Sequence, residues 1–241
     1  MHRHPHPEAH DHDDVGQVLT RRQALGLFTT PFLLAFAGCD QGAAEDAPIS
    51  GSCVVRPELT EGPYYLDTDL LRSDIREDRA GVPLALSFAV SRVVENACET
   101  LPGAIVDVWH ADASGDYSGV GSERGSTYLR GVQQTGTDGT ATFQTVYPGW
   151  YSGRAPHIHF KVRSSASSSS AYEFTSQLFF DDDLSREVYT SVEPYSQRGT
   201  MDTSNARDGI YSQGGSQMLL ALTELNDGGY QATFDIALYV D

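Results

Sequence analysis

Basic residues are scarce in this chain. Its 241 residues include 16 lysines and arginines against 33 aspartates and glutamates, a formal net charge of −17, and Lys161 is the sole lysine. A surface of this sign repels a phosphate backbone, so the composition argues against nucleic acid as a partner. Beyond that, the charge indicates little more than solubility.

Cysteine is also rare, and no cysteine cluster is available to bind a metal. The three cysteines are Cys39, Cys53 and Cys98. In an oxidising compartment we expect Cys53 and Cys98 to form a disulfide that ties the N-terminal arm to a core strand, with two buried free thiols as the alternative. Once a leader is subtracted, the length allows one domain with a substantial core.

The longest apolar run near the N-terminus, 28–37, is too short to span a membrane. Arg21 and Arg22 precede it and Gly38-Cys39 closes it. This leader resembles a twin-arginine export signal that ends in a bacterial lipoprotein box, which implies a periplasmic or cell-surface protein with a lipid anchor on Cys39. Phe36 stands where such boxes usually carry leucine, so simple cleavage to a free periplasmic form is the alternative.

We therefore divide the chain into a signal at 1–38, a tether at 39–52 and one domain at 53–241. The tether lacks any apolar period, as expected for a flexible linker. Five of the eight histidines lie in the signal and receive no catalytic role: His2, His4, His6, His10 and His12.

A sustained helical period is missing from the domain, and short β-rich runs separated by turn residues take its place. The runs are 84–94, 104–111, 140–146, 157–162, 174–180 and 231–240. Pro102-Gly103, Asp138-Gly139 and Pro148-Gly149 supply turn chemistry between them. The pattern predicts an all-β, antiparallel β-sandwich with long loops, and one or two short helices at 181–195 and 213–225.

Two of the three histidines outside the signal are His157 and His159, in the alternating run HIHFKV. As a strand, this run points both imidazoles to one face, which makes them half of a candidate metal site. A complete metal site would then require oxygen donors as further ligands. Loops would place Tyr117 and Tyr151 near this strand, and phenolate suits Fe(III) better than zinc or copper(I).

Four motifs occur in order: TEGPYYLD (60–67), DVWHADASGDYS (107–118), PGWYSGRAPHIHFKV (148–162) and TSQLFF (175–180). Together they resemble the intradiol ring-cleavage dioxygenases, over roughly 53–241. The resemblance implies an Fe(III) cofactor held by Tyr117, Tyr151, His157 and His159. It also implies the oxidative opening of a catechol between its two hydroxyl-bearing carbons by O2, to a muconate-type diacid, as in the catabolism of aromatic compounds.

The resemblance assigns further roles around the iron. Tyr151 would leave it and accept a substrate proton, Arg154 would stabilise charge that develops on the ring, and Gln177 would be the companion of Arg154. Substrate contacts would come from Arg154 and from the GPYY region: Pro63, Tyr64 and Tyr65. Tyr147 is the rival of Tyr151, and His110 is expected to be a hydrogen-bonded residue rather than a ligand.

Two departures from the family leave the native catechol and the oligomeric state open. The link SGRAP before His157 is short, and too few residues precede Leu84 for the helical dimerisation segment of the cytoplasmic enzymes. Two other classes of function compete. One is an exported metal- or carbohydrate-binding β-sandwich lipoprotein without catalysis. The other is a zinc hydrolase that uses His157, His159 and an acidic third ligand.

Overall fold

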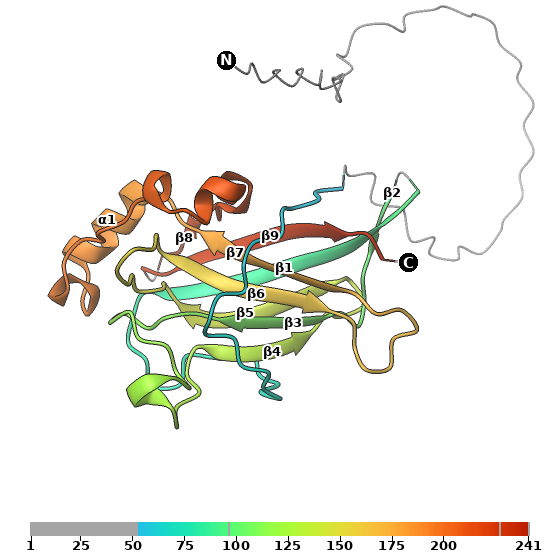
Figure 1. Ribbon diagram of the computed structural model, residues 1–241, viewed down its shortest axis with the longest axis horizontal. Coiled ribbons are helices and arrows are strands. Elements are labelled where there is room, and N and C mark those ends of the chain that lie inside the picture. The colour runs from blue at the N-terminus through green and yellow to red at the C-terminus, as the bar shows by residue number, and fades with distance from the viewer. Residues whose placement is uncertain (1–52, 96, 227, 241) are drawn as a thin grey trace, which may run out of the picture. The chain divides into compact units, whose positions relative to one another are not determined.

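The computed structural model describes residues 53–95, 97–226 and 228–240 (Figure 1). The predicted signal, the predicted lipidation site Cys39 and the predicted tether lie outside these residues. In the described part of the chain, no helix combines the length and apolar character needed to cross a membrane.

Alternation of apolar and polar residues builds β1, the centre of the first sheet. Leu84, Leu86, Phe88 and Val90 are buried, and the residues between them are more exposed, as expected for a strand with one buried face. β1 pairs antiparallel with β2 and β5 and parallel with β9, which pairs antiparallel with β8. The strands of this sheet are β1 (Pro83–Val94), β2 (Ala97–Thr100), β5 (Thr140–Val146), β8 (Thr223–Glu224) and β9 (Tyr230–Leu238).

The second sheet is antiparallel throughout and has the strand order β4, β3, β6, β7. Its strands are β3 (Ile105–Trp109), β4 (Arg130–Gln134), β6 (His157–Arg163) and β7 (Glu173–Phe179). β6 is buried at every position except its last. A strand covered on both faces can direct its apolar side chains to the core and its polar side chains to a second enclosed region.

Aromatic side chains join the two sheets. Phe160 on β6 lies with its ring centroid 5.0 Å from that of Phe88 on β1 and 5.6 Å from that of Phe234 on β9. All three rings are at most 3% exposed. The inner faces of the sheets therefore pack against each other through these residues.

The outer face of the second sheet is covered by residues 57–71, which we call the strap. Leu59 N donates to Thr175 O of β7 (3.1 Å), Lys161 of β6 pairs with Glu61 (2.7 Å), and Leu71 bridges to Val132 of β4. In Figure 1 this segment, in blue to teal, runs across the strands. The strap closes the region into which the polar face of β6 points.

The predicted helix at 181–195 is confirmed as α1 (Asp182–Ser191). Asp181 caps its N-terminus by accepting from the backbone N–H groups of Asp183 and Leu184. The second expected helix, at 213–225, is wrong: the end of one 3₁₀ turn, a second 3₁₀ turn and β8 occur there. Gly214, with a φ of 125°, separates the two turns, and beyond them Leu220 N donates to Phe179 O of β7 (2.9 Å) instead of continuing a helix. The 3₁₀ turns are η1 (Gly121–Glu123), η2 (Tyr195–Gln197), η3 (Asn205–Arg207), η4 (Tyr211–Gln213) and η5 (Gly215–Met218).

Six predicted runs correspond to β1, β3, β5, β6, β7 and β9, and the all-β class with two sheets is confirmed. The expectation of purely antiparallel pairing is wrong, because β1 and β9 pair in parallel from Leu84↔Tyr230 to Arg92↔Leu238. Parallel neighbours need a long crossover, and here nearly the whole domain provides it. Cys53 and Cys98 are joined by a disulfide that ties the start of the described chain to β2.

His110, directly after β3, connects the second sheet to the first. Its Nδ1–H donates to Ala111 O (2.9 Å), and its Nε2 accepts from the hydroxyl of Thr145 on β5 (2.6 Å). Burial, together with the charge of Arg130, lowers the pKa of His110 to about 4. The ring is therefore a neutral structural link between the sheets.

We predict that Phe160→Ala lowers the free energy of unfolding by about 3–5 kcal/mol, because the cavity opens where both sheets meet. Urea denaturation followed by circular dichroism measures this change. Tyr239→Ala is the control, since Tyr239 is 74% exposed and its loss should cost less than about 0.5 kcal/mol. A similar small cost at Phe160 would contradict the packing described here.

We predict that His110 makes the protein less stable as the pH falls from 6.5 towards 4. Because its folded pKa of about 4 lies below the ordinary 6.5, the unfolded chain binds a proton in this window that the folded chain does not. The contribution is complete above pH 6.5 and is lost towards pH 4, on the order of 3 kcal/mol. In NMR titration the His110 ring should remain neutral at pH 5.5, whereas a midpoint near 6.5 would contradict its burial.

Candidate metal centre

β6 brings His157 and His159 to the same face of the second sheet. In the register, His159 lies between Trp109 of β3 and Gln177 of β7. The two imidazoles are 2% and 1% exposed, and their Nε2 atoms are 3.1 Å apart. The predicted convergence of these two nitrogens is therefore present.

Two loops bring tyrosine oxygens to the same point. Tyr117 follows β3, and its Oη lies 3.4 Å from His157 Nε2; Tyr151 precedes β6, and its Oη lies 3.2 Å from that nitrogen. The two loops touch at Gly149, where a Cβ would collide with the backbone oxygen of Asp112. Only glycine permits this close approach, which explains the glycine in the PGW sequence.

The strap contributes the wall next to His159. Gly62 has a φ of 73°, and a Cβ there would lie 3.1 Å from His159 Cε1. Trp109 stacks on the other side of this imidazole, with ring centroids 5.1 Å apart and planes within 8°. The ring of His159 is thus held between glycine backbone and indole, a constraint that the sequence did not reveal.

Both imidazoles are neutral. His157 Nδ1–H donates to Ala155 O (2.6 Å), which leaves a lone pair on Nε2. Burial, with the nearby charge of Arg154, lowers the pKa of His157 to about 3, and burial lowers the pKa of His159 well below its usual value. His159 Nδ1 is buried without a hydrogen-bond partner. Nitrogen lone pairs therefore face a water-poor point.

The tyrosines are protonated unless a cation is present. Burial raises the pKa of Tyr117 well above its usual value and raises that of Tyr151 as well. Donor atoms that share one first-row metal ion at about 2 Å lie roughly 3 Å apart, and the distances here are 3.1–3.4 Å. Two phenolates and two imidazoles suit Fe(III), so these four residues fit the expected group.

The zinc alternative requires an acidic third ligand beside His157 and His159. Among the residues that the structure describes, no three histidine, cysteine, aspartate or glutamate side chains are grouped so that they could hold a metal. His110, the remaining histidine of the domain, has both ring nitrogens engaged in hydrogen bonds. Tyr147 is also elsewhere: it is fully buried in the core, and its hydroxyl bonds Ser185 on α1 (2.7 Å).

Arg154 and Gln177 border the four donors. Arg154 Nη1 lies 3.4 Å from both Tyr151 Oη and His157 Nε2. Its Nη2 donates to Gln177 Oε1 (2.5 Å), and Gln177 Nε2 donates to the strap at Thr60 O (2.7 Å). Gln177 of β7, which is itself bonded to the strap, thus holds the guanidinium so that it faces the predicted site. The remaining partner of the guanidinium, Asp208, was not found from the sequence.

The GPYY residues lie at different places. Tyr64 stacks on Tyr117 with ring centroids 4.5 Å apart. Tyr65 packs on Trp109 (4.9 Å) and lies under Lys161 Nζ (4.3 Å), and Pro63 is exposed. Of the three, Tyr64 is the one that lines the open pocket beside the tyrosines.

That pocket has a volume of about 180 Å³. Its lining combines Tyr117 and Tyr151 with the strap and the loop around η1: Tyr64, Gly115, Asp116, Tyr117, Val120, Gly121, Ser122, Glu123 and Tyr151. Of the four candidate donors, Tyr117 and Tyr151 border this pocket.

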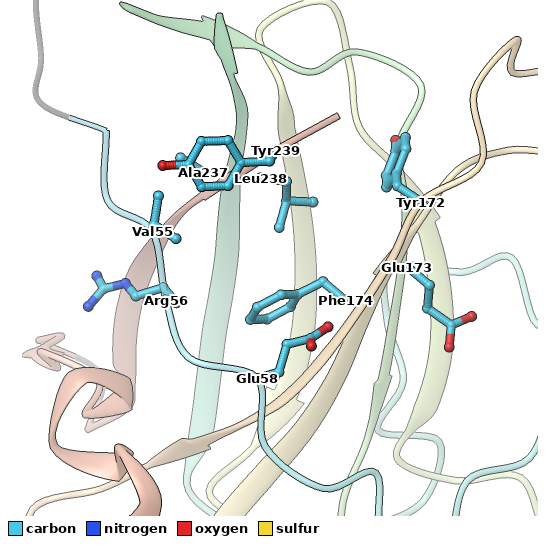
Figure 2. Close-up of a pocket in the computed structure, with 9 residues that line it drawn as sticks. All are labelled: Val55, Arg56, Glu58, Tyr172, Glu173, Phe174, Ala237, Leu238 and Tyr239. Carbon is cyan, nitrogen blue, oxygen red and sulfur yellow. The ribbon is translucent and has the colours of Figure 1, made fainter. Parts of the chain in front are cut away.

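A second cavity, of about 220 Å³, lies between the start of the strap, β7 and the end of β9 (Figure 2). Its lining is Val55, Arg56, Glu58, Tyr172, Glu173, Phe174, Ala237, Leu238 and Tyr239. None of the four donors contributes to it. It has a mixed apolar and charged lining, without a grouping of residues that suggests catalysis.

The sequence is similar to proteins of one known family. Residues 57–195 match the model of the Dioxygenase family. The chain is 30% identical over 145 residues to a chlorocatechol 1,2-dioxygenase of Cupriavidus pinatubonensis, a match that covers 50% of this chain and 53% of that protein. The chain thus spans about half of that relative's length.

Solved structures show the same architecture. The structure of an intradiol ring-cleavage dioxygenase from Tetranychus urticae superposes with a TM-score of 0.66 at 31% identity, covering 78% of this chain and 95% of that one. A 3-chlorocatechol 1,2-dioxygenase from Rhodococcus opacus is similar in fold, with a TM-score of 0.56 at 20% identity, covering 76% of this chain and 72% of that one. Together with the family model, which matches more than half of the sequence, these similarities establish that the chain belongs to the intradiol ring-cleavage dioxygenase family.

Proposed function

We propose that this protein is a non-haem Fe(III) dioxygenase that opens a catechol-type ring between its two hydroxyl-bearing carbons and forms a muconate-type diacid. The observation that carries the proposal is the convergence of Tyr117 Oη, Tyr151 Oη and His159 Nε2 within 3.4 Å of His157 Nε2. Relatives named for catechol and chlorocatechol cleavage support the reaction class.

Tyr117, Tyr151, His157 and His159 would hold the iron. When bound, Fe(III) supplies a Lewis acid that can accept both oxygens of a catecholate and draw electron density from its ring. The bond from His157 Nδ1–H to Ala155 O fixes the tautomer that offers Nε2. Trp109 stacks on the His159 ring and thereby fixes the plane of that ring.

Tyr151 is our candidate for the proton acceptor. It is more exposed than Tyr117, it lines the open pocket, and Arg154 Nη1 lies 3.4 Å from its Oη. Its phenolate oxygen can therefore take a proton from an entering catechol hydroxyl, after which the neutral hydroxyl stays beside the guanidinium.

Arg154 would stabilise negative charge on the substrate ring. Its guanidinium is fixed by Gln177 and faces the point where the four donors meet. Preorganised donors of this kind act where water is excluded and need no reorganisation during the reaction. Gln177 would serve by holding both the guanidinium and the strap at Thr60.

The pocket of about 180 Å³ is the proposed entry for a small aromatic diol and O2. Tyr64 offers an aromatic face beside Tyr117, and substrate contact would come from Tyr64 and Arg154. Tyr65, the last residue of the GPYY segment, packs against Trp109. We assign it the role of supporting Trp109.

We also propose that the signal at 1–38 directs export by the twin-arginine route and that Cys39 carries a lipid anchor. A disulfide between Cys53 and Cys98 agrees with an oxidising compartment. The two packed sheets at 53–241 are interpreted as a β-sandwich that carries the metal site on the outer face of one sheet.

The reaction is tested with catechol under ¹⁸O₂. The iron-loaded protein should consume one O2 per catechol and place both oxygen atoms in a ring-opened diacid, identified by mass spectrometry. Tyr117→Phe and Tyr151→Phe should lower the rate by about two orders of magnitude, the scale of losing one preorganised group. Tyr147→Phe is the matched control, because its hydroxyl bonds only Ser185 in the core, and its rate should stay within about twofold of wild type. No oxygen uptake by the iron-loaded wild type with simple catechols would overturn the proposal.

A further inference from the structure

Asp208 is a buried carboxylate that contacts the candidate site from outside the segment matched by the family model, which ends at Tyr195. Its side chain is 0% exposed, and its Oδ2 accepts from Arg154 Nε at 2.8 Å. The same oxygen accepts from the backbone N–H of Ala155, also at 2.8 Å. One oxygen atom therefore holds both the guanidinium and the peptide that precedes β6.

The other carboxylate oxygen fixes Asp208 itself. Oδ1 accepts from the backbone N–H groups of Ile210 (2.7 Å) and Tyr211 (3.0 Å). Burial alone would raise the pKa of Asp208, but the bonds from Tyr211, Arg154 and Ala155 hold it below its ordinary value. The group is thus an ionised, fully hydrogen-bonded anchor whose position is set by its own loop.

The contact to Ala155 continues to the imidazole. Ala155 N–H donates to Asp208, and Ala155 O accepts from His157 Nδ1–H (2.6 Å). Ala155 therefore connects the carboxylate to the His157 ring through its N–H and its C=O, which belong to two successive peptide groups. The Nε2 atom of this ring lies within 3.4 Å of the other three donor atoms. Asp208 thus contacts Arg154 directly, and it is connected to His157 only through Ala155.

The loop that carries Asp208 is attached to the 148–155 loop at further points. Trp150 Nε1 donates to Gly199 O (2.9 Å), and Gly153 N donates to Asp202 Oδ1 (3.1 Å). At its other side, Asn205 N donates to Asp182 at the start of α1 (3.0 Å). The segment 196–213 is therefore part of the wall that supports Arg154, although it lies beyond the matched residues.

We propose that Asp208 is a positioning residue that sets the direction of the Arg154 guanidinium towards the substrate ring. The proposal rests on the proposed dioxygenase function. Arg154 can rotate about its side-chain bonds, and the Nε contact to Asp208 together with the Nη2 contact to Gln177 fixes its plane from two directions.

Asp208→Asn is the test variant, because it keeps the shape but removes the charge and one acceptor oxygen. We expect kcat to fall by about tenfold to a hundredfold with KM within about threefold, the scale of a misplaced catalytic group. Iron content and the tyrosinate absorption band should match those of wild type. Asp74→Asn is the matched control, since it breaks an exposed Asp–Arg pair with Arg76 (2.7 Å), and it should leave kcat unchanged.

A double-mutant cycle separates positioning from general support of the fold. In an Arg154→Ala background, Asp208→Asn should change kcat by less than about threefold, because its effect passes through the missing guanidinium. If the two effects multiply in full, or if Asp208→Asn alone has wild-type kcat, the proposal is wrong.

The metal-free protein gives a readout that needs no activity. In a ¹⁵N-edited NMR spectrum, the Arg154 Nε–H, identified by its disappearance in Arg154→Lys, should be slow to exchange with water. In Asp208→Asn it should exchange faster, while Asp74→Asn leaves it unchanged. An unaltered Arg154 resonance in Asp208→Asn would overturn the positioning role even if the protein had no dioxygenase activity, so the two proposals can fail separately.

Discussion

The arrangement of the site depends on the burial of β6 on both faces. Ile158, Phe160 and Val162 fill the core between the sheets, while the alternate residues His157, His159 and Lys161 point under the strap. A strand covered in this way cannot shift its register by one residue without exchanging imidazoles for apolar side chains in the core. The position of both nitrogen donors is therefore fixed by the same packing that joins the two sheets.

The loss of hydration on the polar face of β6 determines the protonation of the imidazoles and phenols there. Imidazoles that are 2% and 1% exposed remain neutral, and phenols buried beside them resist losing their protons. Left alone, such groups cost free energy, because a buried donor or acceptor without a partner loses its hydration. A trivalent cation reverses this balance, since it binds nitrogen lone pairs and replaces the phenolic protons.

Sequence patterns revealed the elements whose signal is local. Alternation located β1, β5, β6, β7 and β9, and the acidic residues at 181–183 indicated the start of α1. The short or polar strands β2, β4 and β8 carry little apolar alternation, and turn residues say nothing about the parallel pairing of distant β1 and β9. Asp208 had no recognisable signal, because its role arises only when a distant loop reaches Arg154. The stacking of Trp109 on His159 likewise depends on strand register and not on spacing.

We expect Tyr117 and Tyr151 to bind Fe(III) together with His157 and His159 in a site that substrate can reach. The most direct measurement is the visible absorption spectrum of the iron-loaded protein, with metal analysis, before and after anaerobic addition of catechol. The protein should be coloured, from tyrosinate-to-Fe(III) charge transfer, and its absorption band should shift when catechol is added. A protein that contains stoichiometric iron but is colourless, or whose colour does not respond to catechol, would contradict this set of iron ligands.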